Sequence, residues 1–316
     1  MNKTLLKNKK IVIDGVIFQL QKNSNLGIAR VWKNLINCLI DSEYRDDIII
    51  IDRGGMPSFN TEVETISHFP YSFQNHDKDI KSLSNLCEDI GDCLFFSTYF
   101  TYVTAKRSVI IIHDMIPEVL AMNLSEPRWI TKYKAIKNAD SIICVSNNTI
   151  NDLKKIYPTE VQKKDIYLLY NFVDKETFKP VHKSYVDDFK GENNLTKPYF
   201  LLVGRRTFYK NSIQFFKAFA SWSENSKFQI LCVGGGEIES LAKQFIDDEQ
   251  LVTISYLEES DLNLAYNGAH ALVYNSIYEG FGLPVIEAFS VGCPVISAKS
   301  SLAVEEISSS NTISVD

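Results

Sequence analysis

One stretch of the sequence, residues 274–295, specifies a strand end, a glycine turn, a helix and a second strand in immediate succession. The apolar run at residues 269–274 is typical of a buried strand, and Gly280 and Gly282 then provide a turn. Pro284 stands at a position typical of the first turn of a helix. The order is that of a parallel α/β unit whose turn presents backbone N–H groups at a helix N-terminus, where phosphates and other anions bind.

Two glutamates bracket this turn, Glu279 in the loop and Glu287 in the predicted helix. A carboxylate beside an anion site is electrostatically unfavourable unless it faces hydroxyl groups. Sugars and ribose supply such groups. The stretch reads Glu-Gly-Phe-Gly-Leu-Pro-x-x-Glu-Ala, with Gly-x-Pro-Val behind it. It resembles the donor-site signature of GT-B glycosyltransferases, specifically retaining family four, the group 1 glycosyltransferases. The alternative is a purely structural turn in a parallel α/β protein.

The composition is that of an ordinary globular chain, with 316 residues, 45% hydrophobic and 23% charged, and the length favours two domains. The net charge of −6 is divided unevenly, because residues 1–170 carry +1 and the remainder −7. Contact with an anionic membrane or glycan is therefore to be sought in the first half. We expect no nucleic acid partner.

The six cysteines form no Cys-x-x-Cys pair and stand mostly in apolar runs, which predicts buried, reduced thiols and a cytoplasmic chain. The basic N-terminus precedes a strand-like segment and not a signal peptide. No apolar stretch reaches 18 residues, so any membrane contact is expected to be peripheral, at the inner face.

The first half alternates predicted strands and helices. Residues 10–18 predict a first strand, and Gly27 opens a helix at a turn of the kind that holds phosphate in many α/β folds. The resemblance places this glycine against the donor diphosphate, and a simple helix start is the alternative. We predict an irregular excursion facing the acceptor at residues 53–90. The remaining predictions for this half are strands at 48–51, 93–97, 109–112 and 139–146, helices at 129–137 and 147–157, and a last strand at 168–171.

Asp77, Lys78 and Asp79 match the Asp-x-Asp metal motif of the other major glycosyltransferase fold. That motif requires the end of a buried strand, where two carboxylates can hold a divalent cation against a diphosphate. Here it stands in a polar segment, and we predict a solvated charge cluster and no metal site.

His113 and Asp114 follow the predicted strand at residues 109–112, at the end of the strand where parallel sheets place function. A lone histidine is more often structural. The segment His-Asp-Met-Ile-Pro is similar to the His-Asp-x-x-Pro pattern of the family, which implies that His113 reaches the donor sugar.

The second half restarts the alternation after a polar linker at residues 174–198, with strands at 199–203, 228–233 and 252–257. Arg205, Arg206 and Lys210 surround the glycine turn after the first of these strands. Guanidinium groups give bidentate contacts and an ammonium gives a compact charge, so the set suits a diphosphate. The segment resembles the Val-Gly-x-Arg-x-x-x-Lys-Asn element of the family. The spacing leaves open which arginine takes the role.

The resemblance implies a fold of two doubly wound, Rossmann-like parallel-sheet domains facing a central cleft, here residues 1–172 on the acceptor side and 173–316 on the donor side. It implies transfer of a sugar from a nucleotide-sugar donor to a glycan, lipid-linked or other hydroxyl acceptor, in surface glycan synthesis. The catalytic residues implied are Glu279, His113 and Lys210, with no metal or other cofactor. The donor-binding residues implied are Gly27, Arg205, Arg206, Lys210, Tyr256, Leu257, Gly280, Phe281, Gly282, Leu283 and Glu287.

The family usually continues past the point that corresponds to residue 316. The expectation is therefore weak donor binding, and an apolar surface that invites a partner protein or self-association. Three other readings remain: a nucleotide-sugar epimerase of the same architecture, a non-catalytic glycosyltransferase-like subunit, and a plain glycan-binding module. Donor turnover without an acceptor would favour the first of these.

Overall fold

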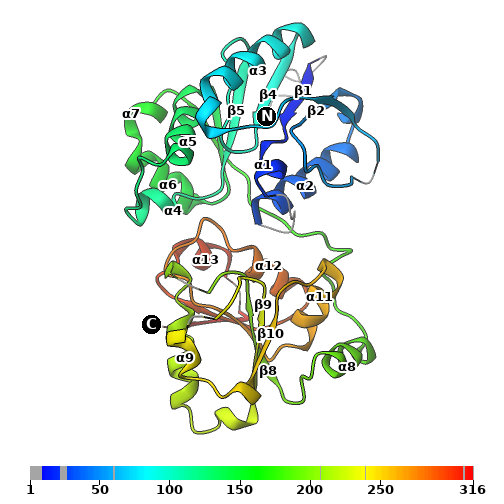
Figure 1. Cartoon of the computed structure of the whole chain (residues 1–316), viewed down its shortest axis with the longest axis vertical. Helices are drawn as coiled ribbons and strands as arrows, with labels where there is room; N and C mark the ends of the chain where they lie inside the picture. Colours follow the sequence, from blue (N-terminus) through cyan, green and yellow to red (C-terminus); the bar gives the residue numbers. More distant parts are fainter. Residues whose placement is uncertain are drawn as a thin grey trace. The chain divides into compact units, whose positions relative to one another are not determined.

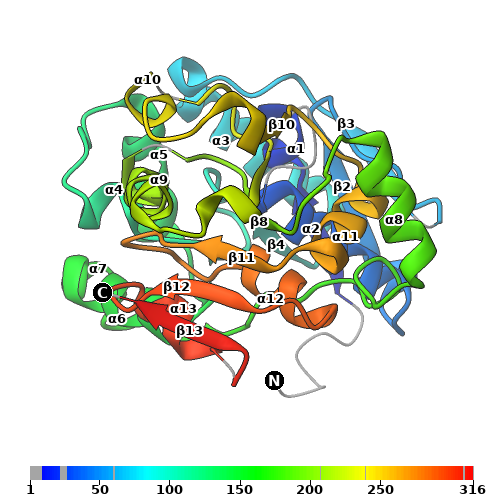
Figure 2. The same ribbon diagram turned by 90° about the horizontal axis from the view of Figure 1, so that it is seen from below.

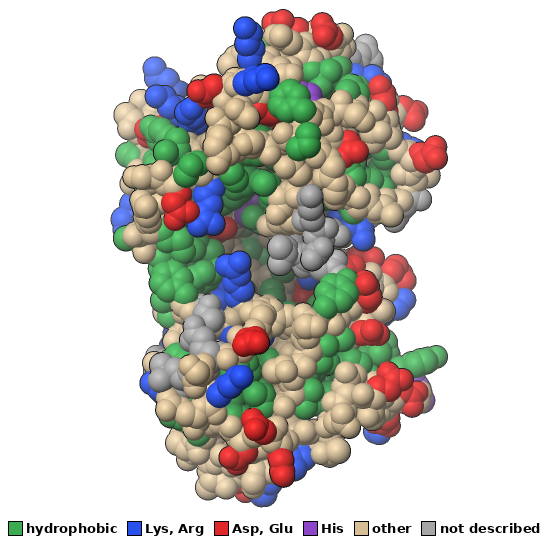
Figure 3. Space-filling model, in the orientation of Figure 1, with side chains coloured by type: hydrophobic (Ala, Val, Ile, Leu, Met, Phe, Trp, Pro, Cys, Tyr) green, Lys and Arg blue, Asp and Glu red, His purple; other side chains and the backbone are tan. Residues whose placement is uncertain are grey.

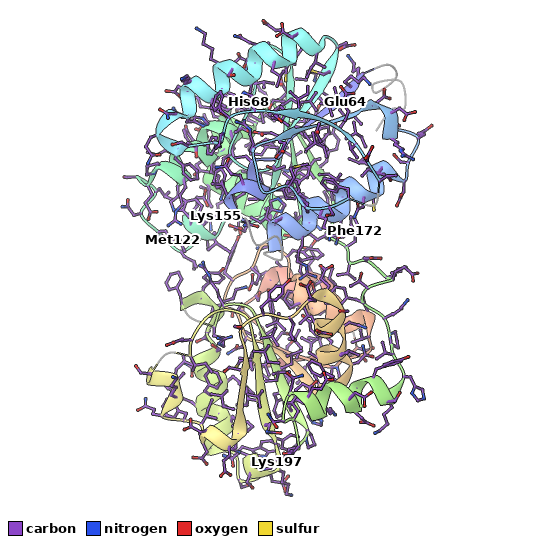
Figure 4. The ribbon with its side chains drawn as sticks, turned by 45° about the vertical axis from the view of Figure 1, so that its right-hand side comes forward. Glu64, His68, Met122, Lys155, Phe172 and Lys197 are labelled. Atoms are coloured by element: carbon purple, nitrogen blue, oxygen red, sulfur yellow. The ribbon has the colours of Figure 1, made fainter. Side chains whose placement is uncertain are left out.

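A computed structural model describes residues 9–21, 27–59, 61–206, 208–238, 240–308 and 310–315. The chain divides into two compact units, residues 1–171 and 172–316, against a predicted boundary between residues 172 and 173 (Figure 1). Figure 4 marks Phe172, the first residue of unit 2, and Lys197, which stands just before the first strand of that unit.

Unit 1 is a parallel sheet covered by helices. Within the described residues the sheet has seven strands in the order β3-β2-β1-β4-β5-β6-β7. The strands are β1 Lys10–Asp14, β2 Ile48–Asp52, β3 Glu64–Ser67, β4 Cys93–Ser97, β5 Arg107–Ile112, β6 Ser141–Cys144 and β7 Asp165–Leu168. The helices are α1 Val16–Leu20, α2 Gly27–Ile40, α3 His76–Ile90, α4 Ile116–Val119, α5 Pro127–Asn138, α6 Asn147–Ile156 and α7 Pro158–Val161, with 3-10 turns η2 Arg45–Asp47 and η3 Phe73–Asn75.

Unit 2 repeats the architecture. Its described part contains six parallel strands in the order β10-β9-β8-β11-β12-β13, and Figure 2 shows β11, β12 and β13 lying next to one another. The strands are β8 Tyr199–Val203, β9 Gln229–Val233, β10 Leu251–Ile254, β11 Ala271–Tyr274, β12 Val295–Ala298 and β13 Thr312–Val315. The helices are α8 Lys183–Glu192, α9 Ser212–Ser221, α10 Ser240–Lys243, α11 Glu259–Gly268, α12 Leu283–Ser290 and α13 Leu302–Ile307, with 3-10 turns η4 Phe208–Lys210, η5 Asn225–Lys227 and η6 Asp248–Gln250.

Helices cover both faces of the unit 2 sheet, which explains why its strands are nearly all apolar. Successive residues of a strand point to opposite faces. In β8, Leu201 packs with the residues of α11, α12 and α13, whereas Phe200 and Leu202 pack with those of α9 and α10. The doubly wound parallel fold predicted from the sequence is thus confirmed for each unit.

The first strand is shorter than predicted. It ends at Asp14, and the apolar residues after Gly15 form helix α1 and not the continuation of the strand. The N–H of Gly15 donates to the carbonyl of Ile51 at 3.0 Å, and the N–H of Ile17 donates to Thr98 Oγ1 at 3.2 Å. These bonds turn the chain out of the sheet.

Two segments predicted to be irregular contain regular structure. Residues 53–90 hold β3 and the 15-residue helix α3, which buries Ile80, Leu83 and Cys87 at helical spacing. The linker at residues 174–198 contains α8, whose Val186 and Phe189 are buried. Both helices are mostly polar, so their apolar residues give a weak periodic signal in the sequence.

The strand predicted at 168–171 is β7, which ends at Leu168, and the strand predicted at 252–257 is β10, which ends at Ile254. Beyond β12 the chain adds α13 and β13, and β13 pairs in parallel with β12. The C-terminal residues therefore extend the unit 2 sheet by one more helix–strand step.

The thiols are largely as predicted. Five of the six cysteines are buried, and burial raises the pKa of Cys144 and Cys232 to about 12 and that of Cys293 to about 11. Cys38 is the exception, because it lies on an exposed position of α2.

Candidate functional site

The strand order of unit 2 reverses between β8 and β11, which are neighbours in its sheet. After β8 the chain continues to β9 and β10 on one side, and the strands from β11 onward lie on the other. Doubly wound sheets bind ligands at such a switch point, beyond the carboxyl ends of the strands. The two loops that start there carry the predicted cations and the predicted glutamate.

Lys210, in η4 after β8, and Glu279, in the loop after β11, contact each other directly. Lys210 Nζ lies 2.5 Å from Glu279 Oε1, and the two side chains are 21% and 8% exposed. The same Nζ lies 5.3 Å from the ring centroid of Tyr274. The structure therefore brings together two of the three predicted catalytic residues, which are 69 positions apart in the sequence.

Tyr274, at the end of β11, belongs to this cluster and was identified in the sequence only as a strand residue. Burial, with the nearby Glu279 carboxylate, raises the pKa of its phenol well above the usual value. The phenol therefore keeps its proton and can donate to an oxygen. Its position at the carboxyl end of an apolar strand, five residues before Glu279, is the signal that could have identified it.

Two hydrogen bonds fix the loops that carry the pair. Asn275 Nδ2 donates to the carbonyl of Asn211 at 2.6 Å, and the N–H of Ile277 donates to the carbonyl of Tyr209 at 2.8 Å. These bonds join the loop after β11 to the loop after β8. The two loops therefore hold each other in place, and with them the ammonium and the carboxylate.

The two arginines occupy different environments. Arg206 is 6% exposed, and its Nη1 donates to the carbonyl of Gly234 at 2.5 Å while its Nη2 donates to the carbonyl of Gly236. Arg205 is exposed. Arg206 thus fastens the glycine turn after β9, and Arg205 has the more accessible guanidinium.

Glu287 lies inside unit 2. It is fully buried in α12, and its Oε2 accepts a hydrogen bond from Tyr266 Oη at 2.7 Å. Gly282 caps the same helix with φ +119°, a conformation that residues with a side chain rarely adopt. Gly282 itself has no side chain that could cap the N–H groups of this N-terminus.

The other predicted donor-binding residues of unit 2 surround these loops or follow β10. Gly280 and Phe281 are buried and Leu283 is half-buried at the start of α12. Tyr256 is 50% exposed after β10, and Leu257 packs against the core of the unit.

In unit 1, His113 stands directly after β5, as predicted. It is buried, and its Nε2 has no hydrogen-bond partner among the described residues. Burial and the nearby Lys132 ammonium lower its pKa to about 3, so the imidazole is neutral at physiological pH. Gly27 is the first residue of α2 and is exposed, and residues 22–26 of its predicted turn lie outside the described residues.

The prediction of a solvated cluster at Asp77 and Asp79 is wrong for Asp79. Asp77 is exposed and lies 2.7 Å from Lys134 Nζ, whereas Asp79 is buried and lies 2.6 Å from Arg53 Nη1. Helical periodicity is the cause, because α3 directs Asp79 into the unit and Asp77 outward. The two carboxylates therefore have different partners and surroundings. No group of three or more His, Cys, Asp or Glu residues in the described part could hold a metal ion.

Charges of both signs are interspersed on the displayed face of each unit (Figure 3). Among the described helices, none is long and apolar enough to cross a membrane.

Comparison with known proteins identifies similar sequences and similar structures. Residues 186–313 match a family model described as Glycosyl transferases group 1. The chain is 30% identical over 209 residues to the O-antigen chain mannosyltransferase RfbU of Salmonella typhimurium, which covers 64% of this chain and 55% of the relative. It is 24% identical over 319 residues to the serotype-specific mannosyltransferase WbdA of Escherichia coli, covering 91% of this chain and 37% of WbdA. The chain thus spans about half the length, or less, of these curated relatives.

Among solved structures, WaaG, a glycosyltransferase involved in lipopolysaccharide biosynthesis, superposes with a TM-score of 0.72 at 15% identity. The match covers 96% of this chain and 85% of WaaG. At this identity the likeness shows the fold alone, and it extends over both units.

Proposed function

Since residues 186–313 belong to the group 1 glycosyltransferases and both units have the GT-B architecture, we propose that this chain transfers a hexose from a nucleotide sugar to a hydroxyl group of a glycan acceptor. The contact between Lys210 and Glu279 at the switch point of unit 2 carries the proposal. It joins a cation suited to a diphosphate with a carboxylate suited to sugar hydroxyls.

In the proposed reaction the bond between the anomeric carbon and the diphosphate breaks, and its electron pair stays on the diphosphate oxygen. The acceptor oxygen forms the new bond to the anomeric carbon, and the proton of that hydroxyl passes to the departing diphosphate. Negative charge grows on that oxygen, where Lys210 and the exposed Arg205 would stabilise it. Arg206 would act indirectly, because its guanidinium already holds the carbonyls of Gly234 and Gly236.

Binding of the donor would exchange partners within the Lys210–Glu279 pair. The ammonium would move from the carboxylate to the diphosphate, and Glu279 would then accept hydrogen bonds from hydroxyls of the transferred sugar. His113 would contact the same sugar, and Glu287 would contact the ribose. We further propose that the reaction retains the anomeric configuration and needs no metal ion, since the cations of unit 2 supply the positive charge.

The similarity to an O-antigen chain mannosyltransferase and to a serotype-specific mannosyltransferase makes mannose the first sugar to test. We propose a role in the synthesis of a bacterial-type surface glycan, with an acceptor that is a growing glycan chain.

The test starts with thermal shifts of the purified chain against a panel of nucleotide sugars that includes GDP-mannose and UDP-glucose. Turnover is then measured with GDP-mannose as donor and octyl α-mannoside as acceptor, and NMR of the product gives the anomeric configuration. Mannosyl transfer that requires the acceptor supports the proposal. Donor conversion without any acceptor would instead indicate an epimerase, and donor binding without turnover across the panel would indicate a non-catalytic subunit.

A further inference from the structure

The turn that follows β5 carries His113 and continues into the short helix α4. Asp114 Oδ1 accepts a hydrogen bond from the N–H of Ile116 at 3.0 Å, which closes the turn locally. A charged side chain from outside the turn makes two further contacts with it.

That side chain is Lys132, on α5. It is fully buried, and its Nζ donates to the carbonyl of Asp114 at 3.0 Å and to Glu118 Oε2 at 2.9 Å. One ammonium therefore holds both the residue after His113 and Glu118, the third residue of α4. It also lies 5.8 Å from the ring centroid of Tyr99, a ring that packs against His113 with its centroid 5.8 Å from that of the imidazole.

The carboxylate of this pair is itself held in place. Tyr157, at the end of α6, donates from Oη to Glu118 Oε1 at 3.3 Å. The Glu118 side chain is 3% exposed, so the carboxylate and the ammonium are both removed from water. Taking two charges out of water costs free energy that their attraction often only just offsets, so stability alone is a weak reason for such a pair.

We propose that Lys132 is a positioning residue for the proposed transfer reaction: it fixes the turn from His113 to Glu118 so that the imidazole of His113 is held ready to bond a sugar hydroxyl. The proposal rests on the function proposed above. Lys132 would not touch the substrate, and would act through the backbone of Asp114 and through its charge.

Two observations explain why the ammonium of Lys132 suits a position near the His113 imidazole. Nε2 of His113 is buried and without a partner in the described part of the chain, and an unsatisfied buried nitrogen costs free energy unless a ligand completes it. A neutral imidazole can exchange one hydrogen bond with an uncharged sugar hydroxyl. The ammonium of Lys132 opposes protonation of His113, and Glu118, paired with that ammonium, leaves the local charge balanced.

The experiment replaces the pair and keeps the fold. The double variant Lys132→Met/Glu118→Leu exchanges two buried charges for apolar side chains of similar size, a change that folded proteins often tolerate. Lys134→Met is the matched control, because it removes a lysine of the same helix whose ammonium is partly exposed and pairs with the exposed Asp77, outside the turn that carries His113. Thermal unfolding confirms that each variant is folded.

Two readouts are then compared with those of the wild type. An NMR titration follows the His113 imidazole, assigned by its loss in His113→Asn. Steady-state kinetics give kcat and KM for GDP-mannose with octyl α-mannoside. In the double variant we expect the His113 titration to move up by about one pH unit, still below that of a free histidine because burial remains. We expect kcat to fall at least about tenfold with KM within about threefold, since the loss is of a contact that matters during transfer. Lys134→Met should leave both readouts near the wild-type values.

A folded double variant with unchanged His113 titration and unchanged kcat would overturn the proposal. If the wild type transfers no sugar from any donor, the proposed function fails by itself, and the titration still decides whether Lys132 controls the charge of His113.

Discussion

The ammonium of Lys210 and the carboxylate of Glu279 lie 2.5 Å apart at the point where the strand order of unit 2 reverses. Each residue leaves a different strand, and backbone contacts join the two loops. A donor diphosphate would compete with Glu279 for the ammonium. The first energetic question about this site is therefore how much Lys210 and Glu279 each contribute to binding and transfer when a donor is bound.

Lys210→Ala tests the cation. Loss of one preorganised charge beside a leaving diphosphate should lower kcat/KM by a factor of about 10² to 10³. The matched control is Lys227→Ala, because Lys227 is an exposed lysine of the same unit that is paired with Glu224. Surface pairs of this kind contribute little, so the control should behave as the wild type does. Turnover by Lys210→Ala at the wild-type rate would remove Lys210 from the site.

The two glutamates should affect different kinetic constants. Glu279→Gln removes the charge in the loop that would meet the transferred sugar, so we expect mainly a lower kcat. Glu287 would bind ribose equally before and during transfer, so Glu287→Gln should mainly raise KM.

Because Glu287 is fully buried beside Tyr266, the stability of Glu287→Gln is measured alongside its kinetics. Reversed effects on kcat and KM would refute the role assignment without affecting the fold. Small and equal effects in both variants would remove the case for a donor site at this turn.

Buried histidines should make unit 1 sensitive to mild acid. Burial, with a smaller effect of the Lys134 charge, lowers the pKa of His76 to about 4, and that of His113 is about 3. Below about pH 6.5 the unfolded chain takes up protons that the folded chain does not, so the free energy of unfolding falls as the pH is lowered. Each histidine should cost about 1 kcal/mol per pH unit between pH 6 and pH 5.

Urea unfolding at pH 8, 7, 6 and 5 measures this dependence, and little change is expected from these groups between pH 8 and pH 7. His76→Phe keeps an aromatic ring beside Tyr71 and Tyr102 and removes one titrating group. It should therefore reduce the loss of unfolding free energy between pH 6 and pH 5 by the amount that one histidine contributes. The same acid sensitivity in His76→Phe and in the wild type would mean that His76 is not the source.

The sequence predicted correctly those elements whose structure is determined by a single short segment. Strands β8 and β11 are continuous apolar runs that can only be buried, and α12 begins at a glycine and a proline whose conformations suit a helix start. Lys210 and Glu279 were both placed in the donor site, just beyond the carboxyl ends of such strands, but their direct contact was not predicted.

Other features depend on partners distant in the chain and leave no local pattern. Helix α3 looked irregular because its buried residues are spaced among charged ones, and one of those charges, Asp79, is itself buried against Arg53. The Lys132–Glu118 pair is likewise invisible in the sequence, where a lysine on a polar helix indicates only a solvated face. Burial of a charge is decided by tertiary packing, which a segment read alone does not contain.

The last prediction is that sugar transfer survives chelation of divalent metal ions. The two carboxylates that could suggest a metal site point to different surroundings, since the side chain of Asp77 is 82% exposed and that of Asp79 is 1% exposed. A cation held against a diphosphate needs several oxygen ligands converging on one accessible point. Asp79 instead accepts hydrogen bonds from Arg53, which also donates to Asp14. Turnover of GDP-mannose in millimolar EDTA should therefore equal turnover without it.

Substitutions separate the two carboxylates further. Asp77→Asn should change neither activity nor stability appreciably, because an exposed ion pair contributes little. Asp79→Asn should lower the thermal stability of unit 1, because it leaves a buried guanidinium short of one charged partner. Activity that disappears in EDTA and returns with Mg²⁺ or Mn²⁺ would show that a cation binds elsewhere in the chain, and that Lys210 and Arg205 do not neutralise the leaving diphosphate alone.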